Sequence, residues 1–177
     1  MQAYVKTLIF SLFGIKSLPT MSRTSSSDGY VCIEDCVVRL GEHKPEVFDS
    51  KNFILTKTFK GLLRQLASVV SVSSFAIILE GPTSAGKTSC VSYLAAVTHN
   101  KVIRINNHMH TDVQEYLGSY VPDAVTGKLT FQEGVLVEAV RKGYWVILDE
   151  LNLAPSEVLE ALNRLLDDNR ELHIVET

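Results

Sequence analysis

The chain is poor in the features that mark several classes of protein. Its 177 residues include only three cysteines, an odd number too small for a disulfide scaffold, so we expect a reducing environment. Basic residues are not in excess: 17 of them against 20 acidic residues give a formal net charge of −3, which argues against sequence-independent nucleic-acid binding. The longest apolar stretch, residues 8–15, is far shorter than the ~20 residues of a transmembrane helix. We therefore expect no membrane partner and no direct sequence-specific nucleic-acid binding.

What remains is the composition of an ordinary globular domain. Apolar residues make up 46% of the chain and charged residues 21%, and the length corresponds to about one domain. Residues 1–20 carry a short apolar patch without a clean cleavage site, and residues 21–29 are polar and rich in turn formers. We therefore predict a leader and linker over 1–50, poorly ordered in part, and a folded domain over 51–177.

Beyond residue 55 the sequence alternates between helical spacing and short apolar runs. Apolar residues at helical spacing predict helices over 56–70, 87–97, 134–142 and 155–166. Continuous apolar runs predict strands at 75–79, 102–105, 144–148 and 171–175. We expect the first strand to be buried on both faces, and a Thr126-Gly127 turn predicts a small hairpin over 121–131. Strands separated by helices predict an α/β fold, with a parallel sheet and helices on both faces.

One segment matches the phosphate-binding pattern G-x-x-x-x-G-K-[ST] in full. It consists of Gly81, Pro82, Thr83, Ser84, Ala85, Gly86, Lys87 and Thr88, followed by Ser89. A predicted strand precedes it and a predicted helix follows it, which is the context that this pattern requires. The glycines permit positive φ, so successive backbone N–H groups can face an anion beside the positive end of the helix dipole. We predict that residues 81–89 bind a nucleotide, with Lys87 on the β- and γ-phosphates and the Thr88 hydroxyl on Mg²⁺.

Two adjacent carboxylates form the second half of the predicted site. Asp149 and Glu150 follow the apolar run 144–148, 61 residues after Thr88. Open α/β sheets bind their ligands at the carboxyl ends of the strands. We predict that Asp149 holds Mg²⁺ through water and that Glu150 takes a proton from the water that attacks the γ-phosphate. Because a kinase needs no water-activating carboxylate, the pair favours a hydrolase over a phosphotransferase.

Together these motifs resemble AAA+ ATPases, which are P-loop NTPases with a three-layer fold. The acidic pair continues as Leu151-Asn152-Leu153-Ala154-Pro155, and an Asn-x-Ala-Pro run of this kind is typical of the dynein-related branch. Within that branch, the segments similar to the midasin family, giant multi-module ATPases of large ribosomal subunit assembly, are 105–112, 114–120 and 160–171. The hairpin predicted at 121–131 is an insert typical of the same branch. The resemblance covers about residues 52–177.

The resemblance implies both a chemistry and a setting. It implies ATP and Mg²⁺ as cofactors, with Glu150 and Lys87 as catalytic residues and with Thr88 and Asp149 at the metal. It also implies a chaperone-like ATPase module whose partners are neighbouring AAA+ modules of a ring. Such a ring acts on the pre-60S ribosomal particle and its assembly factors in the nucleus, in both nucleolus and nucleoplasm.

The sequence also departs from this family pattern. An AAA+ module continues past the acidic pair to a polar sensor on the next strand, an arginine finger and a helical lid, and we find no candidate for these in residues 151–177. We therefore expect a fold that is incomplete at its C-terminus and an isolated chain that binds ATP weakly and hydrolyses it poorly. A non-hydrolysing nucleotide-binding or interaction fragment stays open as the alternative. His108, His110 and Asp112 lie close in sequence, but no further ligand nearby completes a metal site.

Overall fold

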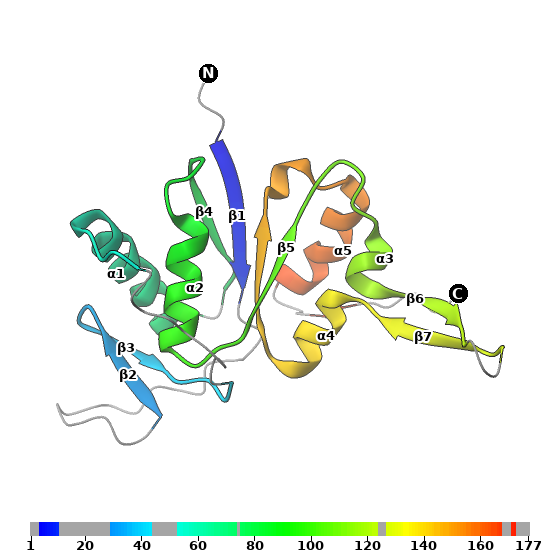
Figure 1. The fold of residues 1–177 in the computed structure, drawn as a ribbon, viewed down its shortest axis with the longest axis horizontal. Helices are drawn as coiled ribbons and strands as arrows, with labels where there is room; N and C mark the ends of the chain where they lie inside the picture. Colours follow the sequence, from blue (N-terminus) through cyan, green and yellow to red (C-terminus); the bar gives the residue numbers. More distant parts are fainter. Residues whose placement is uncertain are drawn as a thin grey trace.

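The computed structural model describes residues 4–10, 29–43, 53–73, 75–123, 127–167 and 171–172, with 4–10 described by their backbone alone. Its centre is a sheet of four strands (Figure 1). In spatial order these are β4 (Ile77–Pro82), β1 (Tyr4–Phe10), β8 (Trp145–Asp149) and β5 (Val102–Asn106). The phosphate-binding segment follows β4 and the acidic pair ends β8, so a single strand separates the two halves of the predicted site.

Strand direction confirms the predicted parallel sheet, with one exception. Strand β5 pairs in parallel with β8, whereas β1 pairs antiparallel with both β4 and β8. Strands β4, β5 and β8 therefore run in the same direction, and their carboxyl ends lie at one edge. The antiparallel strand β1 comes from residues that the sequence analysis assigned to a leader. The structure places this part of the predicted leader in the middle of the sheet.

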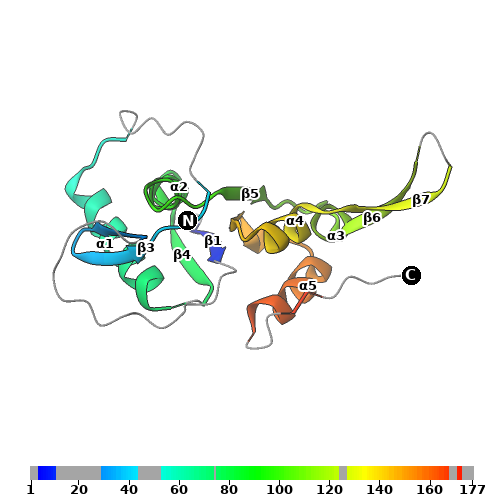
Figure 2. The ribbon, with the colours of Figure 1, turned by 90° about the horizontal axis from the view of Figure 1, so that it is seen from below.

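Helices cover both faces of the sheet, as predicted (Figure 2). The described helices of four or more residues are α1 (Lys57–Val72), α2 (Lys87–Val97), α3 (Val113–Leu117), α4 (Val135–Lys142) and α5 (Ser156–Leu166). Two hydrophobic cores lie on opposite faces of the sheet, and β8 contributes residues to both. Trp145 and Ile147 pack with α1 and α2, while Val146 and Leu148 pack with α3, α4 and α5. This alternation is that of a strand buried on both faces and explains the continuous apolar run.

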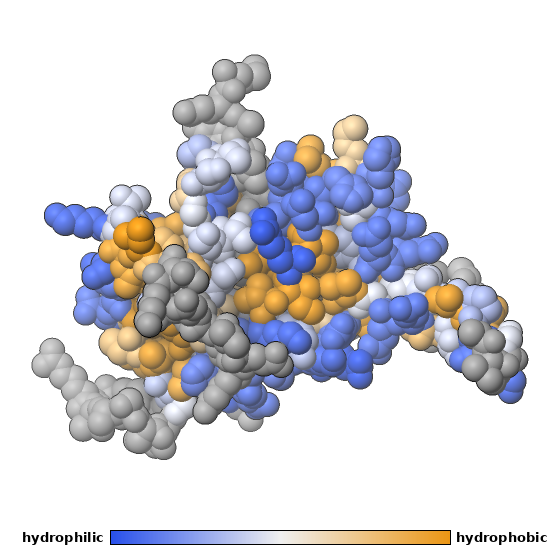
Figure 3. Space-filling view, in the orientation of Figure 1, coloured by the Kyte–Doolittle hydropathy of each residue, from blue (hydrophilic) through white to orange (hydrophobic). Residues whose placement is uncertain are grey.

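Burial distinguishes the two strands that lead to the site. All five residues of β8 are buried, whereas residues of β4 alternate between half-buried and exposed, and Ile78 is 57% exposed. The expectation that the 75–79 run is buried on both faces was therefore wrong. The physical reason is position, because β4 lies at an edge of the described sheet. Strand β5 forms the other edge, and Figure 3 shows hydrophobic residues gathered over it.

Local sequence explains several boundaries of these elements. Helix α1 begins after Thr56, whose hydroxyl accepts a hydrogen bond from the Phe59 amide at 3.2 Å. Helix α4 ends at Gly143, which adopts the left-handed conformation of a C-terminal cap. Helix α3 was not predicted, since five residues are too few to show helical periodicity. For the strand predicted at 171–175, Glu171 and Leu172 are not in a strand and the remaining residues lie outside the described part of the chain.

Two hairpins flank the sheet. Strands β2 (Tyr30–Ile33) and β3 (Cys36–Arg39) form a hairpin whose Ile33 and Val38 pack into the core with α1. The linker predicted just before it, at 21–29, lies almost entirely outside the described residues. Strands β6 (Gly118–Pro122) and β7 (Leu129–Glu133) form the hairpin predicted at 121–131, which projects away from the sheet (Figures 1 and 2). None of the described helices is long and apolar enough to span a membrane.

Candidate nucleotide site

The loop between β4 and α2 has the conformation of an anion-binding turn. Ser84 and Gly86 both adopt positive φ, of 63° and 80° respectively. Gly86 caps α2 in the left-handed region and offers no side-chain acceptor to the first amides of the helix. Those amides therefore keep their hydrogen-bonding capacity and the positive end of the helix dipole for a ligand.

Lys87 begins α2 and folds back over this loop. Its ammonium group donates hydrogen bonds to the carbonyl oxygens of Gly81 at 3.0 Å and Pro82 at 2.8 Å. These bonds hold a compact positive charge at the mouth of the loop, and neutral carbonyl groups are weaker partners for an ammonium than a phosphate is. We call residues 81–89 the loop half of the site.

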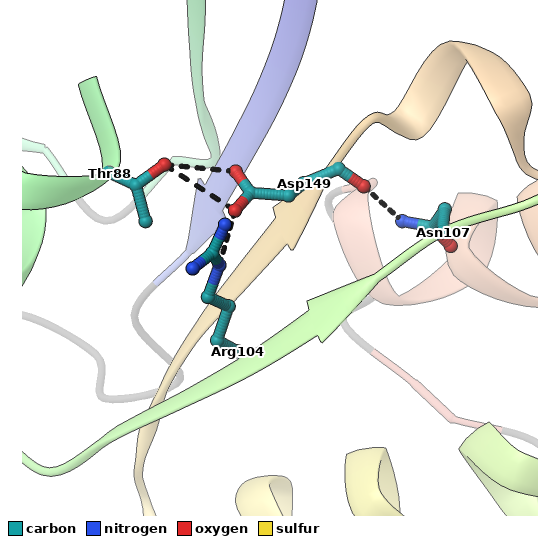
Figure 4. Close-up of polar contacts among 4 residues, drawn as sticks. All are labelled: Thr88, Arg104, Asn107 and Asp149. Atoms are coloured by element: carbon teal, nitrogen blue, oxygen red, sulfur yellow. Dashed lines mark hydrogen bonds and ion pairs between the residues drawn. The ribbon is translucent and has the colours of Figure 1, made fainter. Parts of the chain in front are cut away.

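The two predicted halves of the site meet through Thr88 and Asp149 (Figure 4). The Thr88 hydroxyl donates to the Asp149 carboxylate, at 3.1 Å to one oxygen and 3.4 Å to the other. Only 6% of the Asp149 side chain is exposed. A hydroxyl and a carboxylate at this spacing form the hard oxygen donor set that Mg²⁺ prefers, so the residues present fit the ion.

Arg104 is a site residue that the sequence analysis missed. It lies in the middle of β5, and its guanidinium Nε donates a hydrogen bond to the Asp149 carboxylate (Figure 4). Asp149 therefore faces a hydroxyl from α2 and a cation from β5. The available signal was a single arginine within the apolar run 102–105, because a charged residue inside a buried strand is usually paired.

Asn107 is a second site residue without a role in the sequence analysis. Its backbone N–H and side-chain Nδ2 both donate to the carbonyl oxygen of Asp149, at 3.1 and 2.8 Å. Its Oδ1 accepts a hydrogen bond from the Tyr116 hydroxyl of α3, and both side chains are buried. Burial raises the pKa of Tyr116 to about 12, so the phenol remains a hydrogen-bond donor at neutral pH.

These bonds position Glu150. The carbonyl that Asn107 holds belongs to the peptide bond between Asp149 and Glu150. Glu150 itself adopts left-handed angles, with φ at 52° and ψ at 40°, before the short 3-10 helix η2 (Leu151–Leu153). A non-glycine residue in this region is strained, and such strain persists only where the surroundings fix it. We call Arg104, Asn107, Tyr116, Asp149 and Glu150 the acid half of the site.

Side chains of the segment 108–112, which follows β5 and contains two histidines, make local hydrogen bonds. His108 Nδ1 accepts from the His110 amide at 3.2 Å, and Asp112 caps α3 by accepting from the Gln114 amide at 3.0 Å. Across the described ranges of the chain, no three His, Cys, Asp or Glu side chains gather as a metal-binding group. These residues therefore have roles in a turn and in a helix cap.

Sequence comparison relates this chain to a family of AAA domains and to two midasins. Residues 76–177 match the model of the AAA domain of the dynein-related subfamily. Midasin from Dictyostelium discoideum is 60% identical over 152 residues, which are 86% of this chain and 2% of that protein. Midasin from Giardia intestinalis is 50% identical over 128 residues, or 72% of this chain and 3% of that protein.

A more distant relative is smaller. An uncharacterized protein from Staphylococcus haemolyticus is 32% identical over 99 residues, which cover 54% of this chain and 38% of that protein.

The chain spans only a few per cent of the length of the midasins that it matches. The family match covers more than half of the chain and includes both halves of the site. The chain belongs to the dynein-related subfamily of AAA domains.

Proposed function

We propose that this chain binds ATP together with Mg²⁺ and serves as one ATP-hydrolysing module of a midasin-like ring. The observation that carries the proposal is the hydrogen bond between Thr88 and Asp149, which joins a full phosphate-binding loop to the acidic strand end. In this proposal the amides of the loop half surround the phosphates. Lys87 leaves the carbonyl oxygens of Gly81 and Pro82 to contact the β- and γ-phosphates.

The acid half then supplies the chemistry of hydrolysis. Thr88 and Asp149 would hold Mg²⁺, which neutralises charge that develops on the phosphate oxygens. Glu150 orients the attacking water and accepts its proton, while Asn107 holds the peptide bond before it. A hydrolase uses these groups together, whereas a protein that only binds nucleotide has no need for Glu150 in this position.

The wider setting follows from similarity rather than from the site. Identity of 60% and 50% to two midasins supports membership of a ring with neighbouring AAA+ modules. The family resemblance supports action on pre-60S particles and their assembly factors in the nucleus. Because a ring supplies the arginine finger from a neighbour, we propose that the isolated chain hydrolyses ATP slowly.

Two substitutions test binding and hydrolysis separately. We expect Lys87→Ala to weaken ATP affinity about 100-fold, because a charge-assisted phosphate contact is lost. We expect Glu150→Gln to leave affinity unchanged and to reduce phosphate release, whatever its starting rate. Calorimetric titration with MgATP and a phosphate-release assay measure the two quantities. Lys60→Ala, which removes an exposed lysine from α1, is the matched control.

Each outcome has a clear reading. Normal ATP binding by Lys87→Ala would contradict the assignment of the loop half. Full phosphate release by Glu150→Gln would leave ATP binding intact but remove Glu150 as the base. ATP binding with no measurable release, even when neighbouring modules are present, would favour the non-hydrolysing alternative.

A further inference from the structure

The Arg104–Asp149 ion pair joins an exposed cation to a buried carboxylate. The Arg104 side chain is 59% exposed, whereas the Asp149 side chain is only 6% exposed. An arginine that is exposed to this extent adds little packing, whereas the buried carboxylate of Asp149 needs a positive or hydrogen-bonding partner. The pair therefore has its main consequence at the carboxylate that the proposed function assigns to Mg²⁺.

Arg104 lies on the same face of the sheet as the loop half. In the parallel register Arg104 lies opposite Ile147, two residues before Asp149, and its guanidinium reaches forward to that carboxylate. Figure 4 shows Thr88 and Arg104 approaching the carboxylate of Asp149 together. A cation that binds at Thr88 and Asp149 therefore enters next to the positive charge of Arg104.

We propose that Arg104 is the resident counter-ion of Asp149 and that it tunes how strongly the site couples Mg²⁺ to nucleotide. This inference rests on the proposed ATP site. Without nucleotide, Arg104 neutralises the buried carboxylate and keeps it directed at Thr88. When Mg²⁺ arrives, the guanidinium shares or yields this carboxylate, and its exposure lets it turn into solvent. Arg104 is thus a positioning residue that opposes the divalent ion.

Electrostatics gives the direction of the effect. In excess EDTA, removing Arg104 removes only an attraction to the phosphates, so ATP binding weakens. In Mg²⁺ the same loss is offset because the repulsion between the guanidinium and the metal is removed as well. The loss of affinity is therefore larger in EDTA, which increases the ratio of the ATP dissociation constant in EDTA to that in Mg²⁺. This ratio measures the coupling free energy between the two ligands.

The test measures this ratio by titrating ATP in EDTA and in excess Mg²⁺, using calorimetry on the full chain. We expect Arg104→Gln to raise the ratio about tenfold, an effect partly screened because the guanidinium is exposed. Arg104→Lys keeps the charge and should stay near the wild-type ratio. Arg141→Gln is the control, because it removes the same charge from an ion pair with Glu133. Arg141 lies in the last turn of α4, just before β8 begins, whereas Asp149 ends that strand. This variant should leave the ratio unchanged.

The outcomes separate this inference from the proposed function. If the wild-type chain binds no ATP in either buffer, the proposed function fails and the inference fails with it. If the wild-type chain binds ATP and Arg104→Gln leaves the ratio unchanged or lower, only the inference is overturned. A purely structural role for Arg104 would weaken both affinities equally and would also leave the ratio unchanged.

Discussion

The two halves of the site are built in different ways. The loop half consists of nine consecutive residues whose shape comes from local backbone angles at Ser84 and Gly86. The acid half depends on partners far apart in sequence: Arg104 is 45 residues from Asp149, and Asn107 is 42 residues from it. The first half is a property of a segment, whereas the second exists only when the sheet and α3 are assembled.

This difference predicts different consequences for substitutions. Residues 82–85 and Ser89 of the loop half are exposed, so we expect substitutions there to change nucleotide binding more than folding. Asn107 and Tyr116 of the acid half are buried, so their loss should change folding first. The predictions below test this contrast on each half, beginning with the largest expected effect.

The largest loss of stability is expected from Asn107→Leu in the acid half. This change removes a donor to the Asp149 carbonyl and leaves the buried Tyr116 hydroxyl without its acceptor. We expect the free energy of unfolding to fall by about 3 kcal/mol, because buried polar groups are left unpaired. Chemical denaturation monitored by Trp145 fluorescence measures this loss.

Tyr116→Phe is the matched control for Asn107→Leu. It removes only the hydroxyl and keeps both donors on the Asp149 carbonyl, so we expect a loss of about 1 kcal/mol. If Asn107→Leu cost no more than Tyr116→Phe, the bonds to Asp149 would not stabilise the acid half.

Replacing glycine by alanine should have opposite effects at Gly86 of the loop half and at Gly61 of α1. Gly86 has φ at 80°, and Gly86→Ala should cost about 1–2 kcal/mol of stability and weaken ATP binding. Gly61 lies inside α1, where a Cβ would meet nothing within 4 Å, so Gly61→Ala should stabilise the chain by about 0.5–1 kcal/mol. Thermal unfolding and ATP titration of both variants check this pair of signs. Equal effects at the two positions would contradict the backbone argument.

Alkaline pH should destabilise the chain in two stages, first through Cys90, the residue that follows the loop half, and then through Tyr116 of the acid half. Burial raises the pKa of Cys90 in α2 from 9.0 to about 11 and that of Tyr116 from 10.0 to about 12. Both groups ionise more readily in the unfolded chain. The stability that each buried neutral group contributes is therefore fully present below the pKa of the unfolded chain, and it is lost as the pH rises through the pKa of the folded chain. At pH 10 we expect Cys90 to account for about 1 kcal/mol of lost stability and Tyr116 for less.

Denaturation curves between pH 7 and 11 measure these contributions. Cys90→Ala should flatten the decline that begins near pH 9, and Tyr116→Phe should flatten only the later part. Identical pH profiles for Cys90→Ala and the wild-type chain would show that the thiol is not protected by burial.

The same contrast explains what the sequence could and could not predict. The loop half was predictable because glycine spacing and Lys87 determine it locally, and the strand of Asp149 was predictable from its apolar run. The partners Arg104 and Asn107 were not assigned, since only tertiary pairing brings them to Asp149. Strand β1 was missed for the same reason, because strand order and direction depend on long-range pairing.

The most direct test of the account is a crystal structure of the chain with Mg²⁺ and a non-hydrolysable ATP analogue. The account predicts the triphosphate on the backbone amides of 82–88, with the Thr88 hydroxyl within about 2.1 Å of Mg²⁺. It also predicts Asp149 beside the metal and Glu150 facing the γ-phosphate. A nucleotide bound elsewhere, or Asp149 and Glu150 turned away from the phosphates, would contradict it.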